Sequence, residues 1–290
     1  MRRCLSCGAV FEADAWRCPA CGFEPERRQG YICFAPGLMS DATAFDVESF
    51  IELAKLEDRS FWFPLRNSLI LWALEKYFPS ARSFFELGCG TGVVLKAIAE
   101  RTPDMELSGG DVYVEGLAHA EQRLGTRASL MQVDGTNLPF RDAFDVVGAF
   151  DVIEHIDDDV AAMRELYRAT KPGGGALVIV PRHMFLWSAV DDLAQHKRRY
   201  SGGELRQKMV AAGFTVVRQL TFGALTLPLQ YLSRRHLQTK GPRLSDVLEL
   251  SIPAYQQVIL EALLRLDQIP VRLGVNYPFG ASLMTIARKL

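Results

Sequence analysis

The feature that most constrains the fold is a glycine-rich turn within residues 82–92. A short apolar run ends at an acid, and three glycines then follow at alternate positions: Glu86, Gly88, Gly90 and Gly92. The residues after them have the apolar spacing of a helix. Glycines let the backbone approach a ligand closely, so this strand, turn and helix predict a ligand-binding loop.

The spacing in this turn distinguishes two classes of cofactor. The glycines read G-x-G-x-G, whereas the common nicotinamide and flavin fingerprint is G-x-G-x-x-G. A carboxylate two residues before the first glycine would repel a pyrophosphate, but it suits a ligand that carries an ammonium and a sulfonium. The stretch resembles the first motif of the class I S-adenosylmethionine-dependent methyltransferases. A dinucleotide-binding fold is the alternative.

Further motifs occur in the order that this resemblance requires. A strand ends at Asp111, about 20 residues after the glycines, where the ribose hydroxyls of either cofactor would be held. The next motif contains Asp134 and Gly135 before Leu-Pro-Phe, and in this family that acid faces the adenine amine. A buried strand then runs into Asp151. The resemblance covers residues 45–222 and implies S-adenosylmethionine as the cofactor.

The resemblance also implies an α/β fold, with a Rossmann-like, mostly parallel, seven-stranded sheet and helices on both of its faces. We expect the methyltransferase domain to span residues 81–290, with residues 282–289 as an antiparallel seventh strand. Residues 224–274 would be a helical insertion between the last two strands. This insertion contains Arg234 and Arg235, which are candidate ligands for an anionic group of the acceptor such as a phosphate. It either covers the acceptor pocket, completes the core, or forms the interface of a homodimer.

Four of the six cysteines form two C-x-x-C pairs near the start of the chain. Each pair can form a knuckle, and two knuckles place four sulfur atoms around one tetrahedral zinc ion. We therefore expect residues 1–26 to be a zinc ribbon with these metal ligands: Cys4, Cys7, Cys18 and Cys21. The alternatives are weaker, because a disulfide needs an oxidising compartment and a thioredoxin-like motif needs a βαβ unit.

Residues 27–80 are expected to form a linker followed by two helices before the first strand of the domain. Arg66 lies in the second helix, after an aromatic segment. In methyltransferases of this type such a segment closes over the cofactor, which would pair Arg66 with the methionine carboxylate. The alternative is a core aromatic stripe with a surface arginine.

Candidate catalytic residues follow the fourth strand and a later loop: Asp151, Glu154, His155 and His196. Methyl transfer gains most from alignment, but a hydroxyl acceptor also needs a general base or a metal that lowers its pKa. Open sheets bind ligands at the carboxyl ends of their strands, where these residues are expected. Ubiquinone-biosynthesis O-methyltransferases and small-RNA 2′-O-methyltransferases are similar here, since they hold a divalent cation with acid-x-x-Glu-His.

Three interpretations of these residues remain open. A histidine acts as the general base, or a second divalent cation is bound, or neither is the case. In the last case Asp151 orients the substrate or the methionine amino group, and His155 caps or packs. The usual first acid of the cation motif is glutamate, so the shorter side chain of Asp151 puts that ligand in doubt.

Composition limits the classes of partner. The chain has 290 residues, is 49% hydrophobic and has a formal net charge of −1, which gives no general attraction to nucleic acid. It lacks a signal-peptide core, and it has no apolar run of the ~18 residues that a membrane span needs, so we expect a cytoplasmic protein.

We expect methyl transfer to a hydroxyl of a small or lipid-linked metabolite. N-methylation, or an adaptor without catalysis, is the alternative.

Overall fold

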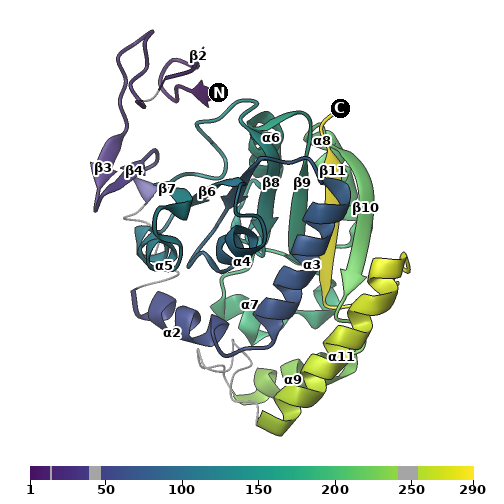
Figure 1. Cartoon of the computed structure of the whole chain (residues 1–290). Coiled ribbons are helices and arrows are strands. Elements are labelled where there is room, and N and C mark those ends of the chain that lie inside the picture. Colours follow the sequence, from purple (N-terminus) through teal and green to yellow (C-terminus); the bar gives the residue numbers. More distant parts are fainter. Residues whose placement is uncertain (14, 39–46, 241–253) are drawn as a thin grey trace.

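Seven adjacent strands form the main part of one large sheet (Figure 1). The structure is a computed structural model that describes residues 1–13, 15–38, 47–240 and 254–290. In chain order the strands are β5 (Ser83–Leu87), β6 (Glu106–Asp111), β7 (Ala128–Gln132), β8 (Phe144–Phe150), β9 (Thr170–Pro181), β10 (Thr215–Phe222) and β11 (Ser282–Arg288). They lie side by side as β10-β11-β9-β8-β5-β6-β7, and β11 is antiparallel to both neighbours while the other pairs are parallel. The mostly parallel, seven-stranded sheet predicted from the sequence is confirmed.

Two further strands extend this sheet beyond β7. They are β3 (Glu26–Arg28) and β4 (Tyr31–Cys33), which form an antiparallel hairpin, and β4 runs parallel to β7. The hairpin turn is Gln29-Gly30, and both residues have positive φ, 52° and 91°, as a two-residue turn of this kind requires. The segment expected to be a linker therefore contains a hairpin, which pairs with β7. Residues 39–46 of that segment lie outside the described residues.

Helices cover both faces of the sheet. One face carries α3 (Trp62–Tyr77), α4 (Val93–Arg101), α5 (Val114–Leu124) and α11 (Ala254–Leu273), and the other carries α6 (Asp159–Ala169) and α8 (Gly202–Ala211). The strands between them are apolar on both sides, because alternate residues such as Phe84 and Phe85 enter different cores. A further helix, α2 (Val47–Glu57), packs against α5. Within the described ranges, no helix combines the length and apolar character that a membrane crossing requires.

The helices between β10 and β11 lie in different places. Helix α11 packs against α3 and β10, and its buried Val271 belongs to the main core. Helix α9 (Leu227–Lys240) instead packs against α7 (Ala189–Leu193), near the edge of the sheet where the parallel strands end. The buried Asp267 of α11 accepts hydrogen bonds from the backbone amides of Gly223 and Ala224, at 2.7 and 2.9 Å, and so fixes the start of the insertion. Residues 241–253 lie outside the described residues.

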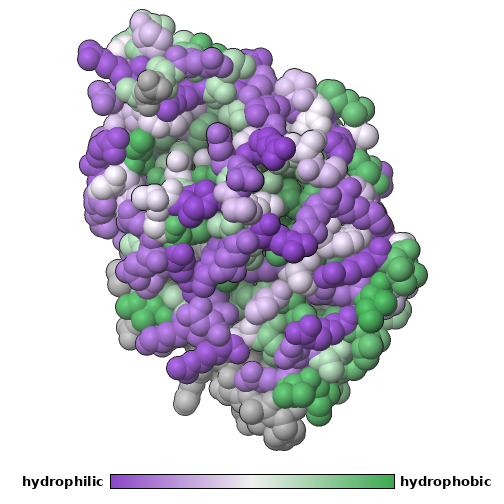
Figure 2. Space-filling model, viewed as in Figure 1, coloured by the Kyte–Doolittle hydropathy of each residue, from purple (hydrophilic) through white to green (hydrophobic). Residues whose placement is uncertain are grey.

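One face of α11 also carries exposed apolar side chains. Figure 2 shows a band of green along the outer edge of this helix. The exposed apolar residues of α11 include Val258, Leu266 and Leu273, which are 66%, 56% and 81% exposed. The insertion thus contributes to the core on one side and presents an apolar stripe on the other. The dimer interface expected from the sequence stays a prediction.

Candidate cofactor and active site

The glycine loop between β5 and α4 leaves space in front of one glycine. All three glycines have positive φ. A Cβ atom at Gly88 would lie 2.2 Å from Val152, and one at Gly92 would lie 2.9 Å from Ala120, so those two positions are closed by packing. A Cβ atom at Gly90 would meet nothing within 4 Å. Gly90 is therefore the point where a ligand can approach the backbone.

The acid at the end of β6 fixes this loop. Asp111 is buried, and its carboxylate accepts hydrogen bonds from the amides of Gly90, at 2.8 Å, and Tyr113, at 3.0 Å. Burial raises the pKa of Asp111, although these amides oppose the shift. Asp134, at the end of the next strand, is half-buried and holds its own turn by accepting a 2.7 Å hydrogen bond from the amide of Thr136. Gly135 lies within this turn, and a Cβ atom there would come within 3.0 Å of Ile156.

Glu86 is a buried carboxylate next to the glycine loop. It is 3% exposed, and its Oε2 atom has no hydrogen-bond partner among the residues that the structure describes. Burial raises the pKa of Glu86 well above its ordinary value, although the charge of Arg66 opposes this. A buried oxygen without a partner is costly unless a ligand supplies one. Together with the open space at Gly90, it fits a cationic ligand such as S-adenosylmethionine.

A second network, which sequence reasoning did not predict, packs against the outside of this loop. Glu57, at the end of α2, is buried and accepts hydrogen bonds from the hydroxyl of Thr91 and from Arg123, the latter at 2.5 Å. Arg123 also donates to Thr91 at 2.8 Å. Since Thr91 lies between two of the loop glycines, α2 and α5 together hold the glycine loop in place.

Arg66 is buried and forms an ion pair with a predicted site residue. It is 6% exposed, which excludes a surface arginine, and its Nη1 atom lies 2.7 Å from Oδ2 of Asp151. Asp151 has a φ of 56°, an unusual conformation for a residue other than glycine, directly after β8. Contact of either residue with the methionine part of the cofactor stays a prediction.

The other three predicted catalytic residues form a separate group. Ligand atoms of Glu154, His155 and His196 all lie within 4.8 Å of one another. The two imidazole rings meet edge to face with centroids 4.7 Å apart. Asp151 is not a member, because its carboxylate faces Arg66. The cation motif of similar enzymes is thus only partly reproduced here.

The carboxylate in this group is buried without a hydrogen-bond partner. Glu154 is fully buried, and neither of its oxygens has a partner in the described part of the chain. The nearby Nε2 atom of His196 lies 3.9 Å from Oε1 of Glu154. Burial, with the charge of Asp151, raises the pKa of Glu154 well above its usual range. Burial and the neighbouring His196 lower the pKa of His155 to about 4, so this imidazole is neutral near pH 7.

Asp191 organises this group, although sequence reasoning missed it. It is fully buried, and its carboxylate lies 2.9 Å from Nδ1 of His196, 2.7 Å from Nε of Arg199 and 2.9 Å from Nη1 of Arg234. Although burial opposes ionisation, these three partners hold the pKa of Asp191 far below its ordinary value. An ionised Asp191 favours the tautomer of His196 with the proton on Nδ1, which leaves Nε2 free on the side of Glu154.

The four cysteines of the two C-x-x-C pairs converge at the other end of the molecule. The sulfur atoms of Cys4 and Cys21 are 3.6 Å apart, and those of Cys7 and Cys18 are 3.7 Å apart. A tetrahedron with zinc–sulfur bonds of about 2.3 Å has sulfur–sulfur distances near 3.8 Å. The backbone at Gly8 has a φ of 76° and returns a hydrogen bond to Cys4, as a knuckle does. The arrangement fits a zinc ion, which stays a prediction.

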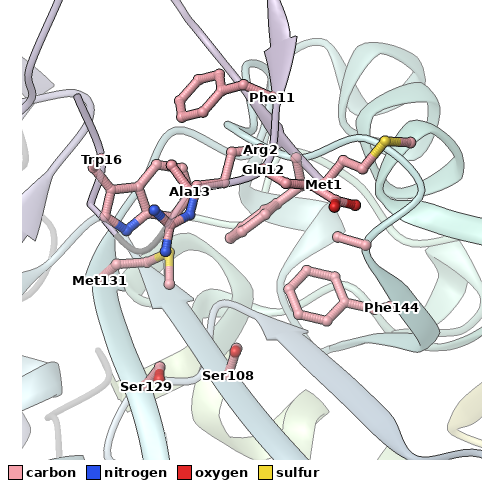
Figure 3. Close-up of a pocket in the computed structure, with 12 residues that line it drawn as sticks. Met1, Arg2, Phe11, Glu12, Ala13, Trp16, Ser108, Ser129, Met131 and Phe144 are labelled. Atoms are coloured by element: carbon pink, nitrogen blue, oxygen red, sulfur yellow. The ribbon is translucent and has the colours of Figure 1, made fainter. Parts of the chain in front are cut away.

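Two cavities flank these sites. One of about 680 Å³ lies between the cysteine-rich module and the sheet, and it is lined by Trp16, Ser108 and Ser129 among others (Figure 3). It faces the amino-terminal halves of the strands, so it does not belong to the glycine loop. A second of about 520 Å³ lies between α9 and the loop that holds Trp187, beside Arg234. The second cavity is therefore the one that adjoins the Asp191–His196 group.

The strand order, the antiparallel β11 and the glycine loop with its two acids agree with the Rossmann-like methyltransferase fold that the sequence predicted. Residues 85–178 match the family model described as a methyltransferase domain. The matched residues include the strands and loops of the candidate cofactor site.

Similar proteins agree with this assignment. A Mycolicibacterium smegmatis protein named as a probable S-adenosylmethionine-dependent methyltransferase is 29% identical over 164 residues, 56% of this chain and 62% of the relative. A ubiquinone biosynthesis O-methyltransferase of Pseudomonas entomophila is 25% identical over 114 residues, 38% of this chain and 48% of the relative. The chain thus spans about half the length of these relatives. Matching relatives also include proteins named as C- and N-methyltransferases.

A solved structure extends the likeness in fold. A chain of the complex between the Haloferax volcanii Trm112 methyltransferase activator and a methyltransferase aligns with a TM-score of 0.56 and 19% identity. The alignment covers 86% of this chain and 96% of that chain. At this identity the likeness shows the fold alone.

Proposed function

We propose that this protein transfers a methyl group from S-adenosylmethionine to a hydroxyl group of a small or lipid-linked acceptor. The observation that carries the proposal is the group of the buried Glu154 and the half-buried His155 and His196, with His196 oriented by Asp191. A hydroxyl acceptor must lose its proton, whereas a neutral amine already has a free electron pair. A buried carboxylate and an oriented imidazole near the end of β8 are what a proton acceptor for a hydroxyl needs.

The cofactor side of the proposal assigns roles to the loop residues. When bound, S-adenosylmethionine supplies a methyl group on a positively charged sulfur atom. Glu86 would accept hydrogen bonds from its ammonium group, Asp111 would hold the ribose hydroxyls, and Asp134 would face the adenine. Gly90 would let the backbone lie against the ligand. Arg66 would meet the carboxylate of the methionine part, with Asp151 keeping the guanidinium in position.

His196 is the residue that we assign as the general base. The Asp191 carboxylate fixes its Nδ1 proton, so Nε2 can take the proton of an acceptor hydroxyl. A negative charge on Glu154, 3.9 Å from Nε2, would stabilise the imidazolium that results, so this step requires Glu154 in its ionised form. His155 packs against the ring and limits its rotation.

A second candidate mechanism uses a divalent cation at the same place. Two imidazoles and a carboxylate without a partner, all within 4.8 Å, are a ligand set that suits manganese, iron or zinc. Such an ion would lower the pKa of the acceptor hydroxyl. Asp191 would then be the outer carboxylate that orients a histidine ligand.

The acceptor would enter through the cavity beside α9. That cavity is lined by aromatic and apolar side chains, including Phe185, Trp187 and Tyr231. Arg234, which the sequence suggested as a ligand for an anionic group, is instead paired with Asp191 and is 15% exposed. Arg235 remains exposed, with its guanidinium 5.5 Å from the ring of Tyr231. Of the two arginines, Arg235 is the better placed to meet a phosphate on a lipid-linked acceptor.

The test uses the purified full chain and methyl-labelled S-adenosylmethionine, with fractionated metabolite and lipid extracts as acceptors. His196→Ala should lower label transfer by about 10²- to 10⁴-fold, the usual cost of losing a general base, while cofactor affinity stays unchanged. His119→Ala, on the distant helix α5, is the matched control.

The products and the metal dependence then separate the alternatives. A product methylated on nitrogen would overturn the hydroxyl assignment, and bound cofactor without transfer to any fraction would favour the adaptor. Transfer that a chelator abolishes and manganese restores would select the cation over the base.

A further inference from the structure

We propose that metal binding by the cysteine site and cofactor binding by the methyltransferase domain strengthen each other, with Arg3 as the positioning residue that links them. The inference rests on the proposed function only in taking the adenosine half of the cofactor to lie beside Asp111 and Asp134. It assigns a role to the N-terminal module, by which we mean residues 1–13 and 15–35.

Arg3 holds the loop that follows Asp134. Its backbone amide donates to the carbonyl of Pro139 at 2.9 Å, and its guanidinium donates to the carbonyl of Leu138 at 2.7 Å and to the side chain of Asn137 at 2.8 Å. From the opposite side, Glu165 of α6 accepts from both Arg3, at 3.0 Å, and the amide of Leu138, at 2.9 Å. Residues 137–139 are thus clamped between the N-terminal module and α6.

The clamped loop is the same turn that positions Asp134. The amide of Asn137 donates to the carbonyl of Asp134 at 3.0 Å, and the Asp134 carboxylate accepts from the amide of Thr136 at 2.7 Å. Loss of the Arg3 contacts would free residues 137–139, and with them the turn. The carboxylate expected to face the adenine would then lose its fixed position, and cofactor affinity would fall.

The position of Arg3 in turn depends on the metal site. Arg3 directly precedes Cys4 and forms β1 (Arg2–Arg3), which pairs with β2 (Val10–Phe11). The buried hydrophobic residues of this ribbon are Cys4, Phe11 and Cys18, so two of the three are cysteines of the metal site. A module with so small a core folds on the free energy of metal binding. Without the ion, Phe11 would be the main buried side chain left to hold β1 in place against residues 137–139.

A second set of contacts braces the strand before Asp134. The side chain of Gln132, fully buried at the end of β7, accepts from the amide of Ala35 at 2.9 Å and donates to its carbonyl at 2.8 Å. Trp16, which lies between the two cysteine pairs, packs against Phe34 and Phe140 with ring centroids 4.7 and 5.7 Å apart. The ribbon, the hairpin and the loop after Asp134 therefore meet at one aromatic cluster.

Because a cavity lies under the N-terminal module, only a few contacts connect the module to the methyltransferase domain. Figure 3 shows Trp16 and Arg2 close together at one side of the cavity, with Met1 and Phe144 on the other. The module therefore touches the domain around an open space of about 680 Å³, not through a packed interface. Arg3 makes the module's hydrogen bonds to residues 137–139, and the neighbouring contacts are the backbone hydrogen bond from Arg141 to Met1, the bridge between Arg2 and Phe140, and the packing of Trp16.

The first experiment measures the affinity of S-adenosylhomocysteine by calorimetry for the zinc-loaded full chain, the chelator-stripped full chain, and zinc-loaded Arg3→Ala. Both the stripped protein and Arg3→Ala should bind at least about fivefold more weakly, the lower end of typical coupling between sites. Arg27→Ala is the matched control, because that arginine is exposed and bonds within its own hairpin, to the carbonyl of Gly30. Arg3→Lys should recover part of the loss.

The second experiment measures the reverse effect. Coupling is reciprocal, so saturating S-adenosylhomocysteine should raise zinc affinity, measured by competition with a chelating dye, by the same factor that zinc raises cofactor affinity. In Arg3→Ala this factor should fall towards one.

Each outcome decides a different question. Equal cofactor affinity in the loaded and stripped forms, or equal behaviour of Arg3→Ala and Arg27→Ala, would overturn the coupling. If the stripped chain unfolds, the cofactor affinities of zinc-loaded Arg3→Ala and zinc-loaded Arg27→Ala still test whether Arg3 links the two sites. Failure of every form, including the loaded chain, to bind the cofactor would instead overturn the proposed function.

Discussion

Glu86 should make cofactor binding dependent on pH. Its pKa in the ligand-free protein lies well above the usual value for glutamate, mainly because the side chain is buried. A cationic ligand binds the ionised form, so binding must release a proton wherever Glu86 is protonated. Affinity should therefore rise with pH, by up to tenfold per pH unit below the pKa of Glu86, and become constant above it.

Glu86→Gln keeps the size of the side chain and removes its charge. A hydrogen bond to a charged group contributes about 1.5–3 kcal/mol, so the variant should bind S-adenosylmethionine about 10- to 150-fold more weakly at a pH where Glu86 is ionised. The pH dependence of binding should also disappear. Glu100→Gln, on the exposed side of α4, should change neither quantity.

The same substitution should have the opposite effect on folding. A carboxyl group whose pKa is raised in the folded state loses stability as pH rises from the unfolded value towards the folded one. Glu86→Gln removes this cost, so the ligand-free variant should melt at a higher temperature than the parent at pH 8, although it binds less well.

Calorimetry between pH 5.5 and 8.5, in two buffers with different ionisation enthalpies, counts the protons released. The reasoning is refuted if Glu86→Gln shows the same proton release as the parent, or if parental affinity falls as pH rises. A variant that is less stable than the parent at pH 8 would show that Glu86 has a partner for its charge in the ligand-free protein.

Three further predictions address the other sites. Gly90→Val should abolish cofactor binding in calorimetry, because its side chain enters the space that is open in front of the loop; retained micromolar binding would contradict this. Purified protein should contain one zinc ion by metal analysis, and Cys18→Ser should lose it; metal-free protein with four accessible thiols would argue against the ribbon. Arg234→Ala should lower the melting temperature by about 2–8 °C, because it removes one partner of a buried carboxylate worth about 1–2 kcal/mol, whereas the exposed Arg235→Ala should leave the temperature unchanged. Equal effects of the two arginine substitutions would show that the Asp191 ion pair does not stabilise the fold.

The sequence predicted the features that depend on local chemistry. Glycine spacing predicts a ligand-binding loop because a glycine without a side chain leaves the backbone open to a ligand, and apolar runs identify the buried strands. The cysteine site could be predicted because each C-x-x-C pair forms its knuckle from neighbouring residues, and the two pairs are only ten residues apart. These predictions needed no knowledge of which distant segments meet.

The features that the sequence could not show depend on contacts between distant residues. Asp191 is one of two adjacent acids in the short helix α7, and its role follows only when Arg234, 43 residues later, returns to it. Its local signal was the capping box with Ser188 at the start of α7. The partner of Arg66 likewise became visible only when α3 met the end of β8. The hairpin at Gln29-Gly30 was missed because the turn lacks the usual asparagine or aspartate before glycine.

The hairpin next to β7 also bears on how the protein behaves in solution. Without β4, strand β7 would be the edge of the sheet, and its unpaired amides and carbonyls could join another chain. The hairpin moves that edge to β3, which has three exposed, charged residues: Glu26, Arg27 and Arg28. So short and charged an edge is a poor template for a further strand. Expression of residues 81–290 alone would uncover β7, so we expect that fragment to aggregate where the full chain stays dispersed.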